Sequence, residues 1–464
     1  MKTLSAWLIS ISVLSYGVNA WSESTSPSAE LEQELKTLQA QLAALETKVN
    51  SGTLYASPVS VAPYVGVTPA YNGTNLIAYN WDVNNDLTLL QLRQSEIQAY
   101  KQLGQTYPDT TRIIFSGELE GESNYTTPYE GTPAGTNFNL TTASLDTFIE
   151  ANRWVSGFMA FGYNDGSGDQ TNRVNNSQLQ LDQGFITVGD LTTSPFYSSI
   201  GQMYVPFGWY NYDTVNSPVT ETLGQVQARA ITLAYHSNNT EITPYAAVYG
   251  YQGATEIDNN PASNATVEEY GANAALAFAS GNFSALVGSS YNSNIAESAG
   301  LQGDGSSGST FNGFAQSSGA ENLAYRVPGA DVYGSLGYSA YTLLVEYTTA
   351  TKAFDKNDLS FNHQGAQPQA MDIEFVYAFN SVHPSSVVFD YGQTWQALAI
   401  GLPQKNYGVT YNTSFWRNTI CGLQLTHNLG YASGSTASGA GQVANLDTVG
   451  VSYNAVALSF TLLF

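Results

Sequence analysis

Apolar and polar residues alternate with a period of two from residue 112 to the end of the chain. In the stretch IIFSGELEGESNY, residues 113–125, Phe115 and Leu119 share one parity. Glu118 and Glu120 share the other parity. This pattern is typical of β-strands with one apolar and one polar face. It predicts sixteen strands, which cover residues 113–125, 140–151, 153–164, 177–190, 196–208, 227–236, 241–252, 266–279, 283–293, 325–337, 340–351, 367–379, 387–401, 406–413, 416–430 and 447–464.

The connections between these strands alternate in length. Short turns, such as the one near Asn152, alternate with long segments rich in Gly, Ser and Asn, such as 209–226 and 294–324, apart from one short connection at 402–405. Short periplasmic turns and long outer loops are typical of outer-membrane barrels. The sequence therefore predicts an all-β transmembrane barrel of about 16 antiparallel strands over residues 112–464, with the amino-terminus in the periplasm.

The chain ends on an amphipathic strand, AVALSFTLLF, residues 455–464. An unpaired strand edge is not tolerated in lipid, so we expect this strand to pair with the first one. The alternation places Phe460 and Leu462 towards lipid and Phe464 at the interface. Such an aromatic terminal strand resembles the signal that the assembly machinery of the outer membrane reads, which makes Phe460, Leu462 and Phe464 the candidate signal residues.

The first 20 residues predict a secretory signal peptide. Lys2 provides the charged start, residues 4–15 are apolar, and Val18-Asn19-Ala20 forms a small-residue cleavage site. No later apolar run reaches the length of about 18 residues that a transmembrane helix needs. Export without an anchoring helix, followed by amphipathic strands, predicts the outer membrane of a Gram-negative bacterium.

Residues 21–50 contain a heptad pattern. Between 29 and 50 apolar residues recur at spacings of 4 and 3, with Glu, Gln and Lys between them. The pattern predicts a coiled coil that joins copies of the chain, as a homotrimer because leucine-rich seams do not strongly favour dimers. The alternative is a single helix that docks its apolar stripe on a domain. The seam residues are Leu31, Leu35, Leu38, Leu42, Leu45 and Val49.

Residues 51–111 are predicted to form a linker and a helix before the barrel. Pro58, Pro63 and Pro69 recur in the linker, which should therefore be extended. The segment 86–104, DLTLLQLRQSEIQAYKQLG, has helical spacing, and Gly104 ends it. We expect this helix either in the periplasm or within the barrel mouth.

Composition supports the barrel and excludes several function classes. Of the 464 residues, 43% are hydrophobic and only 11% are charged, whereas soluble domains average about 25% charged residues. The 31 Tyr and 42 Gly suit the aromatic girdles and turns of a barrel. Removal of the signal peptide takes away Lys2 and makes the net charge −24, which argues against nucleic acid as a partner.

Six stretches of the mature chain carry a family resemblance: DLTLLQLRQSEIQAYKQLG followed by IIFSGELEGESNY, DQGFITVGDLTTSPFYSSIGQMYVPFGWY, SPVTETLGQVQARAITLAY, VPGADVYGSLGYSAYTLLVEY and WQALAIGLPQKNYGVTYNTSFWRNT. In these stretches, and in the leading coiled coil, the chain resembles the LbtU-like siderophore porins. The resemblance implies a 16-stranded outer-membrane barrel that takes up a ferric siderophore without coupling to TonB.

Carboxylates on the inward parity are the candidate site residues. A charge that faces lipid is costly, so the acids should face the lumen. One interpretation is that they line a wet lumen and pair with Arg112, Arg229 or Arg326; the other is a pore that favours cations. The pore-lining candidates are Glu118, Glu120, Glu122, Asp146, Glu150, Asp182, Glu346, Asp372 and Glu374.

The sequence gives little sign of catalysis, so we expect neither an enzyme nor a cofactor. The four histidines are scattered, without a HExxH motif, and no GxSxG motif occurs. The segment DGSGD, residues 165–169, has oxygen ligands but lacks a full calcium loop. Trp209, Tyr210 and Tyr212 are either an aromatic anchor or a ligand-binding loop.

Three functions therefore remain open. The leading hypothesis is a passive channel for a ferric siderophore or a related small solute. The alternatives are a structural or adhesive surface barrel with a plugged lumen, and a general cation-preferring porin.

Overall fold

A computed structural model describes most of the chain after residue 82. The described residues are 59–61, 83–102, 104, 106–107, 110–129, 133–165, 177–237, 241–258, 266–302, 311, 313–314, 322–380, 383–416, 418–439, 442–443 and 449–464. The predicted signal peptide and the heptad seam lie outside these residues.

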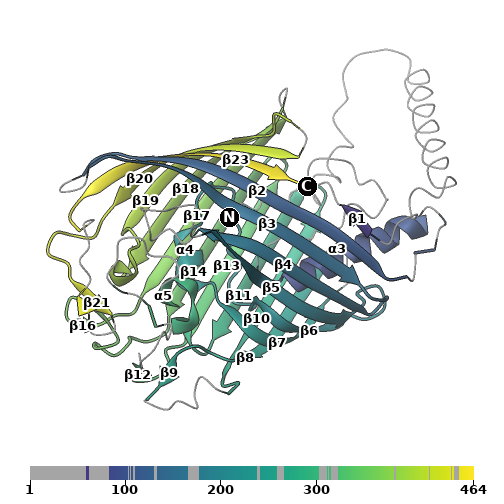
Figure 1. Cartoon of the computed structure of the whole chain (residues 1–464), viewed down its shortest axis with the longest axis horizontal. Coiled ribbons are helices and arrows are strands. Elements are labelled where there is room, and N and C mark those ends of the chain that lie inside the picture. The colour runs from purple at the N-terminus through teal and green to yellow at the C-terminus, as the bar shows by residue number, and fades with distance from the viewer. Residues whose placement is uncertain are drawn as a thin grey trace.

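Sixteen long antiparallel strands form one closed barrel (Figure 1). Each strand pairs with the next long strand, and β23 closes the sheet by pairing with β2 from Leu463–Glu118 to Ala455–Thr126. The predicted fold class is confirmed. The barrel strands are β2 (Arg112–Thr126), β3 (Gly135–Glu150), β4 (Val155–Asp165), β5 (Ser177–Gly189), β6 (Phe196–Tyr204), β7 (Gln227–His236), β8 (Ile242–Tyr251), β10 (Glu269–Ser280), β11 (Phe283–Asn292), β13 (Gly329–Tyr338), β14 (Tyr341–Ala350), β17 (Gln369–Asn380), β18 (Pro384–Trp395), β19 (Lys405–Thr413), β20 (Thr419–Leu429) and β23 (Ser452–Leu463).

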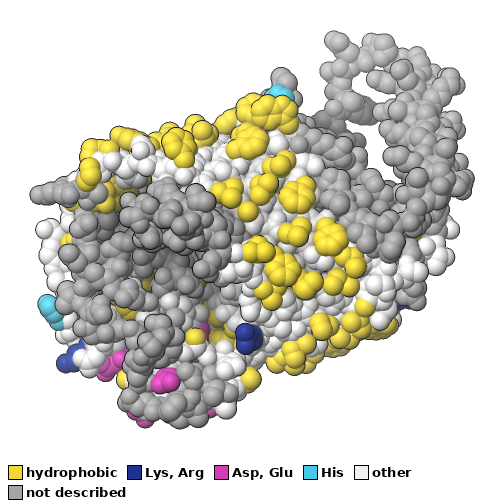
Figure 2. All heavy atoms as spheres, viewed as in Figure 1, with side chains coloured by type: hydrophobic (Ala, Val, Ile, Leu, Met, Phe, Trp, Pro, Cys, Tyr) yellow, Lys and Arg dark blue, Asp and Glu magenta, His cyan; other side chains and the backbone are white. Residues whose placement is uncertain are grey.

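The outer face of the barrel is apolar. Ile186, Ile200 and Ile231 form one row across β5, β6 and β7, and their side chains are 53%, 57% and 52% exposed. The inward neighbours Ser199 and Thr232 are buried. Figure 2 shows apolar side chains spread over the outer surface of the barrel. Such a surface suits lipid rather than water.

The last residue of the chain is fixed at the closure of the barrel. Phe464 and Gly117 exchange two backbone hydrogen bonds, of 2.9 and 3.0 Å. A Cβ atom on Gly117 would lie 2.5 Å from the Phe464 ring and 2.5 Å from the Ser144 carbonyl oxygen. Beyond this point the short strand β1 (Val59–Val61) pairs in parallel with residues 113–115 of β2. Phe460 and Leu462 are exposed on the outer face.

This close approach predicts that Gly117→Ala weakens the closed barrel. The added methyl group must displace the Phe464 ring or the β3 backbone, and such overpacking costs about 1–3 kcal/mol. Gly121→Ala is the matched control on the same strand and face, because its Cβ atom would meet only the Asn139 carbonyl oxygen at 3.9 Å. Urea unfolding in lipid vesicles measures both variants. Equal stability of the two variants would show that the Phe464 contact does not matter.

One end of the barrel carries the short turns and the other carries the long loops; we call them the turn end and the loop end. The chain ends at the turn end (Figure 1). The short elements α4 (Val219–Gly224), β9 (Glu256–Ile257), η1 (Ile295–Glu297), α5 (Ala299–Gln302), β12 (Asn322–Leu323), β15 (Leu359–Phe361), β16 (Gln364–Gly365), η2 (Leu398–Ile400), β21 (Ala437–Gly439) and β22 (Gln442–Val443) belong to the long connections.

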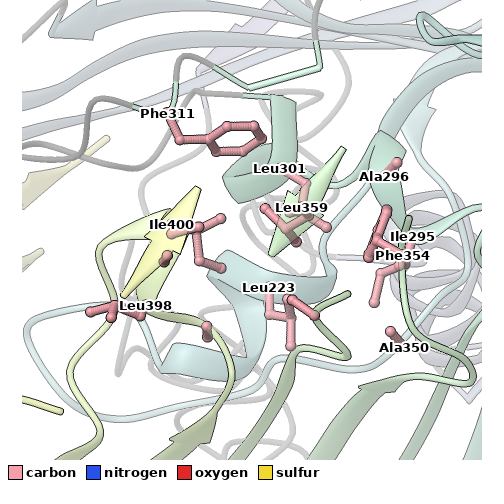
Figure 3. Packing of buried hydrophobic residues seen from close by; sticks show 14 of the residues in the cluster. Leu223, Ile295, Ala296, Leu301, Phe311, Ala350, Phe354, Leu359, Leu398 and Ile400 are labelled. Atoms are coloured by element: carbon pink, nitrogen blue, oxygen red, sulfur yellow. The ribbon is translucent and has the colours of Figure 1, made fainter. Parts of the chain in front are cut away.

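These connections pack on one another in an apolar group that we call the loop-end cluster. Leu223 of α4, Ile295 of η1 and Leu301 of α5 meet Leu359 of β15 and Ile400 of η2 (Figure 3). All five side chains are buried. The loop end is therefore a packed structure with its own core.

The helix α3 (Asn85–Gln102) is the only long helix among the described residues. It matches the helix predicted over 86–104 and lies at the turn end (Figure 1). None of the described helices combines the length and the apolar character needed to span a membrane.

Candidate functional site

Helix α3 lies against the inner wall of the barrel. The buried Arg93 guanidinium donates a hydrogen bond of 2.6 Å to the Gly189 carbonyl oxygen. Leu87 and Leu90 pack on Tyr197 and Tyr245, which point inward from β6 and β8. The sequence left two positions open for this helix, and the structure places it within the barrel mouth.

A buried ion network joins the end of α3 to the barrel rim. The Arg112 guanidinium lies 2.8 Å from a Glu96 oxygen and 2.6 Å from a Glu150 oxygen, and these side chains are 12%, 10% and 6% exposed. The Tyr107 hydroxyl donates to Glu150 at 2.9 Å. Because loss of one partner from a buried ion pair is strongly destabilising, this network fixes the helix in the mouth.

Of the other two arginines expected to pair with the inner acids, only Arg326 does so among the described residues. Arg229 is exposed and shares the outer face of β7 with Ile231. Arg326 pairs with Glu268 at 2.5 Å and with Glu269 at 2.7 Å, at the loop end; Glu269 is buried on the inward parity of β10.

The connection between β6 and β7, residues 205–226, crosses the inside of the barrel; we call it the inner loop. The backbone N–H groups of Trp209 and Tyr210 donate to the two oxygens of Glu346 on β14, at 2.7 and 2.8 Å. The Asp213 N–H donates to Glu374 on β17 at 2.9 Å. Two predicted pore residues thus hold the backbone of this loop.

Residues on β19 and β20 hold the far part of the inner loop. The Gln424 side-chain oxygen accepts hydrogen bonds from the N–H groups of Val215 and Asn216, at 3.1 and 2.9 Å. The Asn412 amide donates to the Asp213 carbonyl oxygen at 2.7 Å. Sequence reasoning missed Gln424 and Asn412, although both are polar residues on the inward parity. Burial raises the pKa of the Asp213 carboxyl to about 7.

Five inward carboxylates form a band on β13, β14, β17 and β18, which we call the acidic strip. Glu346 lies directly opposite Asp372, and Glu374 lies directly opposite Asp390. Asp331 and Asp390 were not among the predicted residues, although they share the same parity signal. Within the described part of the chain, no Lys or Arg forms an ion pair with this strip. The members of the strip are Asp331, Glu346, Asp372, Glu374 and Asp390, all of them buried.

A second group of inward acids lies on β2 and β3. Glu120 accepts hydrogen bonds from the hydroxyls of Thr461 at 2.7 Å and Thr141 at 3.0 Å. Ser144 donates to Asp146 at 3.4 Å. Glu118 and Glu122 share the inward parity of Glu120; Glu118 is buried and Glu122 is half-buried.

Asp182 is a correction to the predicted set, because its side chain lies on the outer face. A β-bulge opposite residues 160 and 161 lets both Leu181 and Asp182 take the outward side. The Asp182 carboxylate accepts hydrogen bonds from outward-facing Gln227 at 2.9 Å and Tyr204 at 3.5 Å. A bulge shifts the parity of a strand by one residue, so simple alternation gave the wrong face.

The inner wall is divided into a polar and an apolar part. The acidic strip and the second group of inward acids lie on the adjoining strands from β13 through β23 to β2 and β3, which we call the polar arc. Among the described residues, β4 to β8 place no carboxylate inward and instead contribute Phe158, Phe185 and Tyr249 to a core with Leu89 of α3.

The remaining predicted features show no separate site. Tyr210 and Tyr212 are buried in the inner loop, inside the barrel. The segment 165–169 lies largely outside the described residues. Over the described ranges, no group of three or more His, Cys, Asp or Glu is arranged to hold a metal ion.

Comparison with known proteins adds relatives and distant structural likenesses. No family model matches the chain. Among solved structures, it is similar to the outer membrane channel DcaP of Acinetobacter baumannii, with 11% identity, a TM-score of 0.47 and coverage of 76% of this chain and 98% of that one. It is also similar to OmpT of Vibrio cholerae, with 10% identity, a TM-score of 0.46 and coverage of 77% and 99%.

Curated relatives are much more similar in sequence. A UPF0422 protein of Coxiella burnetii is 37% identical over 417 residues, which are 88% of this chain and 84% of the relative. A UPF0422 protein of Legionella pneumophila is 33% identical over 408 residues, which are 87% of this chain and 76% of the relative. The chain belongs to the UPF0422 family.

Proposed function

We propose that this protein is a passive, cation-preferring porin of a Gram-negative outer membrane, with the turn end in the periplasm. The observation that supports it most is the polar arc, over which residues 209–215 of the inner loop are held by side-chain acceptors. An acidic wall raises the local concentration of cations and disfavours free anions. The ions pass through the lumen along the polar arc.

A change of charge on the polar arc tests this proposal. Replacing Glu118 and Glu120 together by Lys removes two negative charges and adds two positive ones, so the cation preference is expected to fall. The reversal potential of purified protein in a planar bilayer under a salt gradient measures the preference. Glu268→Lys at the exposed loop end is the control and should leave it unchanged. An unchanged reversal potential in the double variant would show that Glu118 and Glu120 do not line the ion path.

Uptake of a ferric siderophore is the finer part of this proposal. It is supported by the resemblance to the LbtU-like siderophore porins, and the acidic wall would favour a cationic over a polycarboxylate ligand. Growth on iron-chelated medium with a supplied siderophore, with and without the gene, tests it. Equal growth of both strains would refute siderophore uptake without refuting the porin.

We further propose that the seam from Leu31 to Val49 joins three copies through a coiled coil in the periplasm.

A structural or adhesive barrel with a plugged lumen is the second candidate. Its specific support is that α3 lies in one mouth while the loop-end cluster packs over the other. A plugged barrel would seal a bilayer, whereas the porin passes a steady current.

A further inference from the structure

A small pocket lies between the inner loop and the acidic strip. The loop contributes one aromatic ring to it, and the wall contributes two carboxylates. The lining residues include Trp209, Asn211, Pro218, Leu344, Glu346 and Asp372.

Asp372 is the unsatisfied group of this pocket. Its side chain is 7% exposed, and it accepts no hydrogen bond from any described residue. Glu346 and Glu374, by contrast, each accept two hydrogen bonds from the inner loop. A buried charge without a partner is costly, so the site has an unmet need for positive charge.

The neighbouring carboxylate increases this need. Asp372 lies directly opposite Glu346 on the adjacent strand, and both side chains point inward. Like charges in directly opposite positions of a sheet repel each other. A cation beside Asp372 would reduce the repulsion between Asp372 and Glu346, and it would also give the Asp372 carboxylate a partner.

Trp209 supplies a fixed aromatic face to the same pocket. Its ring stacks on Tyr333 with the centroids 5.9 Å apart, and its backbone N–H donates to Glu346 at 2.7 Å. The face of a Trp ring attracts ammonium and guanidinium groups. The ring and the carboxylate are therefore two features that favour the same ligand chemistry. Metal ions are a poorer fit, because no described group of three or more acidic, His or Cys side chains is arranged as ligands.

We propose that this pocket binds an organic cation, a primary amine or a guanidinium group, between the Asp372 carboxylate and the Trp209 ring. The inference deepens the proposed porin function, on which it rests, by naming basic organic solutes as the substrate class. A solute that moves along the polar arc would pause at this point of the inner loop.

Ligand binding to the purified full-length mature protein in detergent micelles tests the proposal. Propylammonium and ethylguanidinium are the probes, with propan-1-ol and propionate as neutral and anionic controls, and saturation-transfer NMR reports binding. We expect both cations to bind at least ten-fold more tightly than either control. Equal binding of propylammonium and propan-1-ol by the wild-type protein would overturn the proposal without recourse to any variant.

Two variants locate the binding. Asp372→Asn should weaken propylammonium binding at least ten-fold, whereas Glu268→Gln at the exposed loop end should change it less than two-fold. Gel migration with and without heating verifies that each variant is folded. Unchanged affinity in folded Asp372→Asn places the ligand elsewhere and refutes the site.

The failure of this site and the failure of the porin are distinguishable. Binding is measured without a membrane. Amine binding by a protein that passes no current through a bilayer would therefore support the binding site and refute the channel. Current through the bilayer without amine binding would support the channel and refute the binding site.

Discussion

Replacing both Glu346 and Glu374 by Ala is expected to raise the single-channel conductance at least two-fold. These two carboxylates accept four hydrogen bonds from the inner loop, three of them from backbone N–H groups. A hydrogen bond to a charged group contributes about 1.5–3 kcal/mol, so the double variant loses the four hydrogen bonds that hold residues 209–214 of the loop to β14 and β17. The freed loop then narrows the lumen less. Conductance in planar bilayers measures the effect.

The matched control removes the same charge without touching the inner loop. Glu118 and Glu120 also face inward, but they lie on β2, away from the loop contacts on β14 and β17. Their replacement by Ala should shift the ion preference and leave the conductance within about a factor of two, because the bore is unchanged. If both double variants conduct alike, the inner loop does not set the bore.

The second large effect is expected on the outer face, where Ile231→Arg should destabilise the barrel by about 2–4 kcal/mol. Ile231 is 52% exposed within the apolar row on β5, β6 and β7, so the new charge would face hydrocarbon. Reversible urea unfolding from lipid vesicles gives the free energy of unfolding of the variant and of the wild-type protein.

Depth in the membrane provides the control for this prediction. Val267 is 68% exposed, more than Ile231, but it lies just before β10 begins at the loop end. Val267→Arg should therefore cost only about 0–1 kcal/mol, as expected near the membrane interface. If Ile231→Arg and Val267→Arg lower the free energy of unfolding equally, the outer face does not contact a bilayer.

The strands were predictable because lipid imposes a strict alternation on them. Every strand must present apolar residues outward, so the period of two is visible even where the polar side is varied. Asp182 shows the limit of this signal. A single inserted residue at the bulge reverses the parity, and no feature of the local sequence marks where the extra residue falls. The expected pairing of Arg229 with the inner acids is wrong for a different reason: it ignored the alternation, which places Arg229 on the outer face with Ile231.

The candidate site was predictable only as a set of residues. Parity identified Glu346, Asp372 and Glu374 as inward carboxylates, and the structure places them on one strip. It could not show what they contact, because Trp209 and Glu346 are 137 positions apart in the chain. Residues 209–226 have the composition of an outer loop. Their inward path depends on side-chain hydrogen-bond partners on four distant strands, β14, β17, β19 and β20.

The conductance of the wild-type mature protein in a planar bilayer tests the central claim most directly. A porin whose inner loop lies over an acidic wall should give discrete, steady current steps carried mainly by cations. A bilayer that stays sealed, in the wild-type protein and also after Glu346 and Glu374 have been replaced by Ala, would contradict the channel and favour a plugged structural barrel.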